Sequence, residues 1–179
     1  PNGMKPVADH IHSLGMKAGL YTDAGTRTCG SLWNKDSIGI GAGIYGHEPQ
    51  DAQLYFGDWG FDFIKIDYCG GEVLGLDEKE RYTSIRNSID KVNKNVSINI
   101  CRWAYPGTWA KDAATSWRIS GDINAHWNSL KYVVGKNLYL SAYAGNGHYN
   151  DMDMMVIGFR NNSRVGGNGL TPTEEEAHF

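Results

Sequence analysis

The amino-acid sequence predicts an α/β fold, a (β/α)8 barrel that is incomplete in this chain. Helical and strand patterns alternate, which favours parallel βαβ units. The most regular strand, residues 61–67, is largely apolar on both faces, as expected for a parallel sheet covered on both sides. Polar residues gather where strands end, the edge at which barrels keep their chemistry. Such barrels need about 250 residues, and the chain has 179. We therefore expect one partial barrel domain over residues 1–179.

The first half of the chain reads as a helix, a strand and a long loop, followed by a second helix and strand. Residues 1–15 carry apolar side chains at helical spacing and end at a glycine. Residues 17–21 predict a short strand, and the stretch 24–48, rich in glycine and polar residues, predicts a loop. A helix is expected over 49–59, ahead of the strand that ends at Asp67.

The strand ending at Asp67 carries charge at its last positions. Side chains two residues apart in a strand point the same way. Phe61, Phe63, Lys65 and Asp67 therefore share one face. A lysine and a carboxylate at the C-terminal end of such a strand predict a functional site, and the alternative is a solvated ion pair at a sheet edge.

The second half continues the alternation. The charged, amphipathic stretch 77–94 predicts a helix. The elements expected after it are a strand at 96–100, a short helix near 108–115, a strand ending at Asp122, a helix over 123–135, and strands near 138–142 and 148–151. A last helix opens at Thr171, with Pro172 at its first position and Glu174 three residues after the cap. The chain is therefore expected to be a piece of a larger barrel.

Composition excludes some partners. The formal net charge of −3 gives no electrostatic reason to expect binding to nucleic acid or to an anionic membrane. No apolar run approaches the length of a membrane span, and no signal-peptide pattern opens the chain. The 6 Trp, 10 Tyr and 5 Phe, many beside Gly, Asn or Asp, suit a sugar site as well as a core.

Two strand-end carboxylates, each with a cation shortly before it, favour glycoside hydrolysis. Asp67 follows Lys65, and Asp122 follows Arg118. A glycosidase needs one ionised carboxylate and one that holds a proton for the leaving group. Lys65 would favour ionised Asp67, which leaves Asp122 as the proton donor, but spacing alone does not assign the two roles.

Metal binding is the competing chemistry. His148, Asp151 and Asp153 could offer hard ligands beside Asp67 or Asp23. Lys65 and Arg118 place positive charge where such an ion would sit, so we expect no metal and no other cofactor.

Several ordered motifs resemble glycoside hydrolase family 27, the α-galactosidase and α-N-acetylgalactosaminidase family. They are Gly15-Met16-Lys17-Ala18-Gly19-Leu20-Tyr21-Thr22-Asp23-Ala24-Gly25, Asp58-Trp59-Gly60-Phe61-Asp62 with Lys65-Ile66-Asp67-Tyr68-Cys69, Trp117-Arg118-Ile119-Ser120-Gly121-Asp122-Ile123, and Tyr149-Asn150-Asp151-Met152-Asp153-Met154. By this resemblance the chain runs from about helix 2 to the start of helix 7 of the barrel. One departure is Met152, where many members have proline.

The resemblance implies a retaining exo-glycosidase that releases terminal α-D-galactose by double displacement. Asp67 would be the nucleophile, and Asp122 the general acid and then base. Substrate-binding positions implied in the same way are Tyr21, Lys65, Cys101, Arg102, Trp103, Arg118, Asp153 and Met154. The expected partner is a carbohydrate, and the oligomeric state stays open.

The family's active-site disulfide would join Cys29 to Cys69, with two reduced thiols as the alternative. A disulfide implies an oxidising compartment, hence secretion or a periplasm. Cys101 would stay unpaired, because its usual partner position, near Ala114, carries no cysteine.

The resemblance leaves the sugar open. Arg102 stands where α-galactosidases usually have glutamate, near the 2-substituent of the sugar. Arginine can serve a 2-hydroxyl but would crowd an acetamido group. The alternatives are a β-L-arabinopyranosidase of the same family, a relative that acts on dextran, and a non-catalytic carbohydrate-binding relative.

Overall fold

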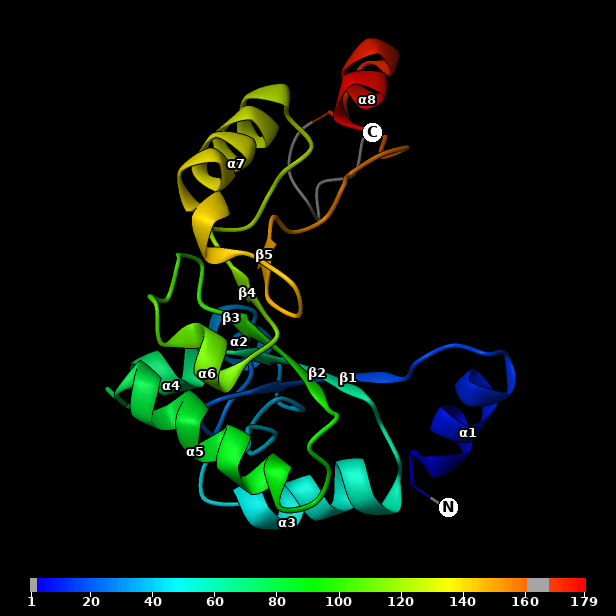
Figure 1. Ribbon diagram of the computed structural model, residues 1–179, viewed down its shortest axis with the longest axis vertical. Coiled ribbons are helices and arrows are strands. Elements are labelled where there is room, and N and C mark those ends of the chain that lie inside the picture. The colour runs from blue at the N-terminus through cyan, green and yellow to red at the C-terminus, as the bar shows by residue number, and fades with distance from the viewer. Residues whose placement is uncertain (1–2, 161–167) are drawn as a thin grey trace. The chain divides into compact units, whose positions relative to one another are not determined.

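The computed structural model describes residues 3–160 and 168–179 in two compact units (Figure 1). One unit contains Pro1–Cys101 and Gly107–Ser116, and the other contains Arg102–Pro106 and Trp117–Phe179. Each unit is described by itself. None of the helices in the described residues is long and apolar enough to cross a membrane.

The first unit is built on a parallel sheet. Its strands are β1 (Gly19–Asp23), β2 (Phe63–Asp67) and β3 (Ser97–Cys101), with β2 between the other two. The register pairs Asp23 with Asp67, and Asp67 with Cys101. All three strands therefore end at one edge of the sheet, which confirms the expected parallel βαβ arrangement.

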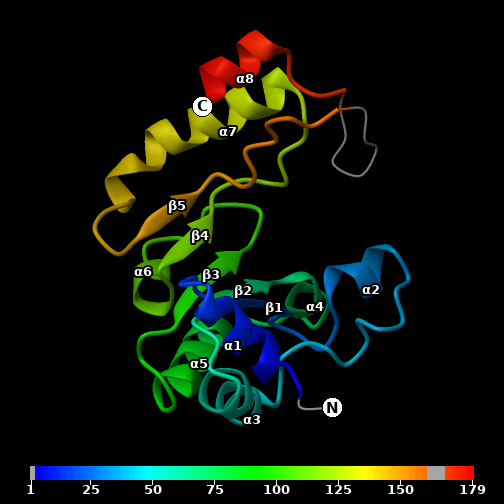
Figure 2. The same cartoon turned by 90° about the vertical axis from the view of Figure 1, so that its right-hand side faces the viewer.

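Apolar side chains hold this sheet to its helices. Ile64, Ile66, Ile98 and Ile100 are buried on the strands, and Tyr82 donates a hydrogen bond from its hydroxyl to the Ile66 carbonyl at 3.0 Å. Figures 1 and 2 show two of the covering helices, α3 and α5, side by side. The α-helices of this unit are α1 (Lys5–Ser13), α2 (Cys29–Trp33), α3 (Glu48–Ala52), α4 (Cys69–Val73), α5 (Glu78–Asp90) and α6 (Ala110–Ala113).

The second unit has its own small core. Its elements are β4 (Ser116–Arg118, whose first residue belongs to the first unit), α7 (Trp127–Leu140), the 3-10 turn η2 (Ser141–Tyr143), β5 (Tyr149–Asp151) and α8 (Pro172–His178). The core consists of Ile123, Ala125, Leu130, Val133, Val156 and Leu170. β4 and β5 are neighbours in the strand order, and the Ile119 amide donates to the Asp151 carbonyl at 3.3 Å.

Most predicted elements are confirmed. The helix expected over 49–59 is present as α3 followed by a π-helical turn, η1 (Gln53–Asp58). α5 begins at its cap, where the Asp77 carboxylate accepts from the Glu80 amide at 2.8 Å. α8 opens with the expected capping box between Thr171 and Glu174. The first two residues of the helix predicted over 1–15 lie outside the described residues.

Three predictions of local structure were wrong, and one helix, α4, was not predicted. The strand expected at 138–142 is instead the end of α7 and η2, because Asn150 Nδ2 donates to the Leu140 carbonyl and supports the helix end. β4 stops at Arg118 rather than running to Asp122. The loop expected over 24–48 contains α2, and α4 directly follows β2.

A buried arginine joins the loop after β1 to the helical layer. Arg81, on α5, donates from Nε to the Ala24 carbonyl at 2.6 Å and forms an ion pair with Glu48. Its guanidinium also lies 4.9 Å from the centroid of the Tyr45 ring. Since Arg81 is 6% exposed, this charge depends on these partners.

We predict that Arg81→Met lowers the free energy of unfolding by about 3 kcal/mol, because it leaves Glu48 without its partner in a largely buried position. Urea denaturation of the full-length protein measures the loss. The control is Lys5→Met, which removes an exposed ion pair to Asp9 and should cost less than about 1 kcal/mol. Equal stability of the two variants would contradict the prediction.

Candidate active site

Asp67 lies at the C-terminal end of β2 in a largely buried position, 8% exposed. The Tyr21 hydroxyl, from β1, donates to its Oδ2 at 3.0 Å, and the Tyr68 amide donates to its Oδ1 at 3.1 Å. Burial and the neighbouring Asp67 raise the pKa of the Tyr21 hydroxyl, so that this group keeps its proton and remains a donor. Both carboxylate oxygens are therefore held in place.

Lys65 and Tyr21 occupy paired positions of β2 and β1. Lys65 lies two residues before Asp67 on the strand and is partly exposed, in line with the shared face predicted from the alternation. Cys101 pairs with Asp67 in the register of β2 and β3, and it is buried and outside any disulfide. The expectation that Cys101 forms no disulfide is confirmed.

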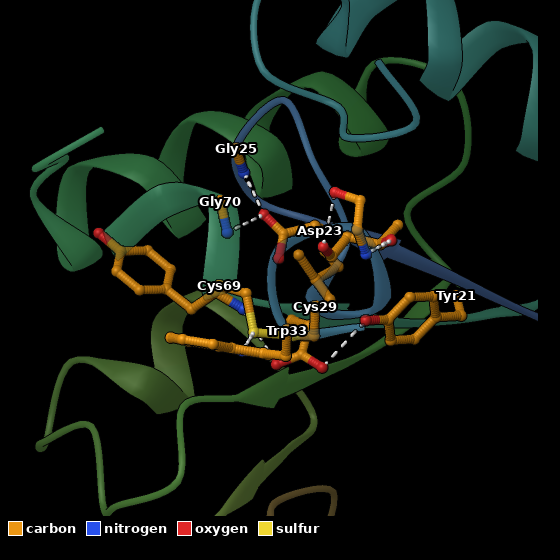
Figure 3. The surroundings of a disulfide bond; sticks show 12 residues. Tyr21, Asp23, Gly25, Cys29, Trp33, Cys69 and Gly70 are labelled. Atoms are coloured by element: carbon orange, nitrogen blue, oxygen red, sulfur yellow. Dashed lines mark hydrogen bonds between the residues drawn. A yellow bond between two sulfur atoms is a disulfide. The ribbon is translucent and has the colours of Figure 1, made fainter. Parts of the chain in front are cut away.

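Asp23 is a second buried carboxylate beside Asp67. Its Oδ1 accepts from the Gly25 amide at 2.7 Å and from the Gly70 amide at 3.0 Å (Figure 3). Burial raises the pKa of Asp23 to about 6, against the opposing effect of these two amides. Asp23 therefore connects the turn after β1 to the turn after β2.

Cys29 and Cys69 form a disulfide, as the resemblance implied. In Figure 3 the Trp33 indole lies along one side of this disulfide, and Asp23 and Gly70 lie on the other. Trp33 Nε1 donates to Cys69 Sγ at 3.3 Å. Sequence reasoning missed Trp33, although its position four residues after Cys29 would place both on one face of a helix.

The second unit places a buried cation against two carboxylates. Arg118 Nη2 lies 3.1 Å from Asp122 Oδ1 and 2.9 Å from Asp153 Oδ2. The Arg118 side chain is 2% exposed and that of Asp153 is 9% exposed, whereas that of Asp122 is 76% exposed. The Ile123 amide also donates to Asp153 Oδ2 at 2.9 Å. Three predicted site residues therefore meet in this unit.

The other predicted positions of the second unit are less enclosed. The Arg102 guanidinium lies 5.4 Å from the centroid of the Trp103 ring, and Trp103 has a φ of 38°. Met154 is 51% exposed. A positive φ at a bulky residue such as Trp103 is uncommon and is found preferentially at functional sites.

Two of the residues considered for a metal have other partners within the second unit. Asp153 is paired with Arg118, and the His148 ring stacks on Trp117 with centroids 6.1 Å apart. Among the described residues, the ligand-like group of closely spaced acidic and sulfur atoms is Asp23 with Cys29 and Cys69. Because those two sulfurs form a disulfide, they offer no thiolate to an ion.

A parallel sheet with acidic and tyrosine side chains at the carboxyl ends of its strands defines a segment of a (β/α)8 barrel with its site at the usual edge. A family model described as alpha galactosidase A, of the Melibiase 2 family, matches residues 1–165. The chain belongs to this family, the glycoside hydrolase family 27 identified by resemblance above.

Individual relatives agree with this assignment. The chain is similar to alpha-galactosidase A of Cellvibrio japonicus (strain Ueda107), with 37% identity over all of this chain and 42% of the relative. A solved structure from Bacteroides fragilis NCTC 9343, provisionally named an alpha-galactosidase, has a TM-score of 0.82 and 33% identity over 98% of this chain and 38% of that one.

A β-L-arabinopyranosidase structure from Geobacillus stearothermophilus is also similar, with a TM-score of 0.67 and 25% identity over 88% of this chain and 42% of that one. The chain spans about two fifths of the length of the curated relatives it matches.

We predict that the Cys29–Cys69 bond contributes about 3 kcal/mol to stability, because it closes a loop between residues 40 positions apart. Urea denaturation of the full-length protein with and without reductant measures this contribution. In the double variant Cys29→Ala/Cys69→Ala, reductant should cause no further loss. A wild-type protein insensitive to a reductant that opens this bond would contradict the prediction.

Proposed function

We propose that the protein carrying this chain is a retaining exo-glycoside hydrolase that releases terminal α-D-galactose from oligosaccharides, polysaccharides or glycoconjugates. The observation that carries the proposal is the Asp67 carboxylate, buried at the end of β2 and held by the Tyr21 hydroxyl and the Tyr68 amide. Membership of the alpha galactosidase A family supports the reaction class and a carbohydrate substrate.

Asp67 acts as the nucleophile. Its carboxylate attacks the anomeric carbon to give a glycosyl ester, and water then hydrolyses that ester. Two donors fix the orientation of the carboxylate, so that little orientational freedom is lost when the attack occurs. Lys65 and Tyr21 lie at paired positions beside it and contact hydroxyl groups of the bound sugar.

Asp122 supplies the proton to the leaving group and then removes one from water. Its solvent-exposed carboxylate can exchange protons readily, and Arg118 fixes one of its oxygens. Asp153, held by the same arginine, accepts hydrogen bonds from sugar hydroxyls, and Arg102, Trp103 and Met154 contact the substrate.

The disulfide favours an oxidising compartment, which is in line with a secreted or periplasmic enzyme.

A β-L-arabinopyranosidase is the second candidate. Two observations favour this candidate: the similarity to the Geobacillus stearothermophilus structure and the presence of Arg102. L-arabinopyranose lacks the exocyclic CH₂OH of galactose, so the two activities differ in one pocket rather than in the chemistry at Asp67.

We predict faster hydrolysis of an aryl α-D-galactopyranoside than of the matching β-L-arabinopyranoside by the full-length enzyme, with EDTA present. Asp67→Asn should lower kcat/KM on both by at least about 10³-fold, because no nucleophile remains. The control Asp9→Asn, on the surface of α1, should leave both rates unchanged. Preference for the arabinoside would identify the enzyme as a β-L-arabinopyranosidase instead. No hydrolysis of either substrate would overturn the proposed function.

We predict that Asp122→Asn affects substrates according to their leaving group. Glycosylation of the enzyme by an alkyl galactoside should slow by about 10²–10⁴-fold, since its leaving group requires a proton. Glycosylation by a dinitrophenyl galactoside, whose phenolate leaves without a proton, should slow far less. Pre-steady-state kinetics measures this step. Equal losses on both substrates would remove Asp122 from the role of general acid.

A further inference from the structure

Asp23 is a fully buried carboxyl group to which the reaction described above gives no role. It ends β1, it is 0% exposed, and its register partner on β2 is Asp67. Its Oδ1 accepts two main-chain hydrogen bonds, from Gly25 and Gly70, whereas its Oδ2 is buried without a hydrogen bond of good geometry. The Gly71 amide also acts on this carboxyl, as the weakest of the three amides. A buried carboxylate oxygen without a donor is unfavourable unless it carries a proton.

The two turns that Asp23 connects touch through their backbones. A Cβ atom added to Gly25 would lie 2.1 Å from the Gly70 carbonyl carbon, and one added to Gly70 would lie 2.6 Å from the Arg27 carbonyl oxygen. Only glycine, which has no Cβ atom, fits at these two positions. Figure 3 shows the Asp23 carboxyl directed at both glycine amides.

Gly70 lies in the first turn of α4, where main-chain amides have no partner within the helix. The side chain of the N-cap residue of α4, Tyr68, does not cap the helix; its hydroxyl donates to the Leu76 carbonyl instead. Asp23 therefore supplies the missing acceptor from the neighbouring strand, and it holds the helix that begins two residues after Asp67.

Asp67 is held from both sides by the segments that Asp23 joins. Ala24, next to Asp23, donates from its amide to the Asp67 carbonyl at 2.8 Å. The Tyr68 amide, between Asp67 and the start of α4, donates to Asp67 Oδ1. A shift of the turn after β2 would thus change the direction of the Asp67 carboxylate.

We propose that Asp23 is a positioning residue for Asp67 and that it works as the neutral acid, accepting two amides at Oδ1 and carrying its proton on Oδ2. This inference rests on the proposed function for its effect on catalysis. In the neutral form Asp23 adds no second negative charge beside Asp67, which must itself be ionised to attack.

The surroundings of Asp23 favour the protonated form of its carboxyl group at acidic pH. Burial and the neighbouring Asp67 raise the pKa of Asp23 to about 6, against the lowering effect of the Gly25, Gly70 and Gly71 amides. The titratable side chains coupled electrostatically to Asp23 are those of Tyr21 on β1, Asp67 on β2 and Tyr82 on α5. The Arg81 guanidinium, also on α5, contacts the carbonyl of the next residue, Ala24. Ionisation of Asp23 above about pH 6 therefore introduces a buried negative charge.

The test compares Asp23→Asn and Asp23→Ala in the full-length protein. Asparagine keeps an acceptor for both amides and carries no charge, whereas alanine keeps neither the acceptor nor the proton. The matched control is Asp36→Asn: Asp36 lies shortly after α2, and its Oδ1 accepts from the nearby Ile38 amide at 2.9 Å. The substrate is a dinitrophenyl α-galactoside, so that the protonation of Asp122 does not limit the first step.

At pH 5 we expect Asp23→Ala to lower the glycosylation rate by about 10- to 100-fold, with KM changed less than about threefold, and Asp23→Asn to retain at least about a third of it. From pH 5 to pH 7.5 the rate ratio of Asp23→Asn to wild type should rise by at least about threefold, because only the wild type ionises at this position. Asp36→Asn should match the wild type throughout.

Equal losses in Asp23→Asn and Asp23→Ala would overturn the positioning role, and a rate ratio independent of pH would overturn the neutral form. Hydrogen exchange gives a readout that needs no activity: the Gly25 and Gly70 amides should lose protection in Asp23→Ala and keep it in Asp23→Asn. If the wild type hydrolyses neither galactoside nor arabinoside while this exchange pattern holds, the proposed function fails, but Asp23 still holds the two turns together through the Gly25 and Gly70 amides. Unchanged protection in Asp23→Ala would contradict that structural role as well.

Discussion

The parallel register of β1 against β2 is the constraint on which the rest of the first unit depends. It sets Tyr21 beside Lys65 and Asp23 beside Asp67, and it brings the turns after the two strands into backbone contact. The disulfide between Cys29 and Cys69 then links the segments that follow those turns. A slip of one residue would send these side chains to the opposite face and separate the hydroxyl of Tyr21 from the carboxylate of Asp67.

The two candidate catalytic aspartates have different surroundings. Asp67 is buried and receives its hydrogen bonds from a tyrosine hydroxyl and a main-chain amide. Asp122 is exposed and contacts a buried arginine, which it shares with Asp153. A pair of carboxylates in unlike environments is what a division into nucleophile and proton donor requires. The sequence predicts a cation near each aspartate, and the structure shows that contact between Arg118 and Asp122.

Periodicity predicted the elements whose stability comes from an apolar face. The strand ending at Asp67 and the helix α5 are of this kind, and the capping box of α8 was visible as a local motif. α2 was missed because it has no buried face and is held by its Thr28 cap and the disulfide. The extent of α7 depends on Asn150, which is distant in sequence. The position of Asp23 against Gly70, 47 residues later, likewise becomes visible only after the strands pair.

The most direct test of the account is to identify the residue that becomes covalently linked to the sugar. A 5-fluoro-α-D-galactosyl fluoride would glycosylate the full-length enzyme and slow the hydrolysis of the resulting ester, and peptide mapping by mass spectrometry would locate the label. The account predicts one ester, on Asp67 at the end of β2. A label on another carboxylate, or turnover with inversion and no label, would contradict it.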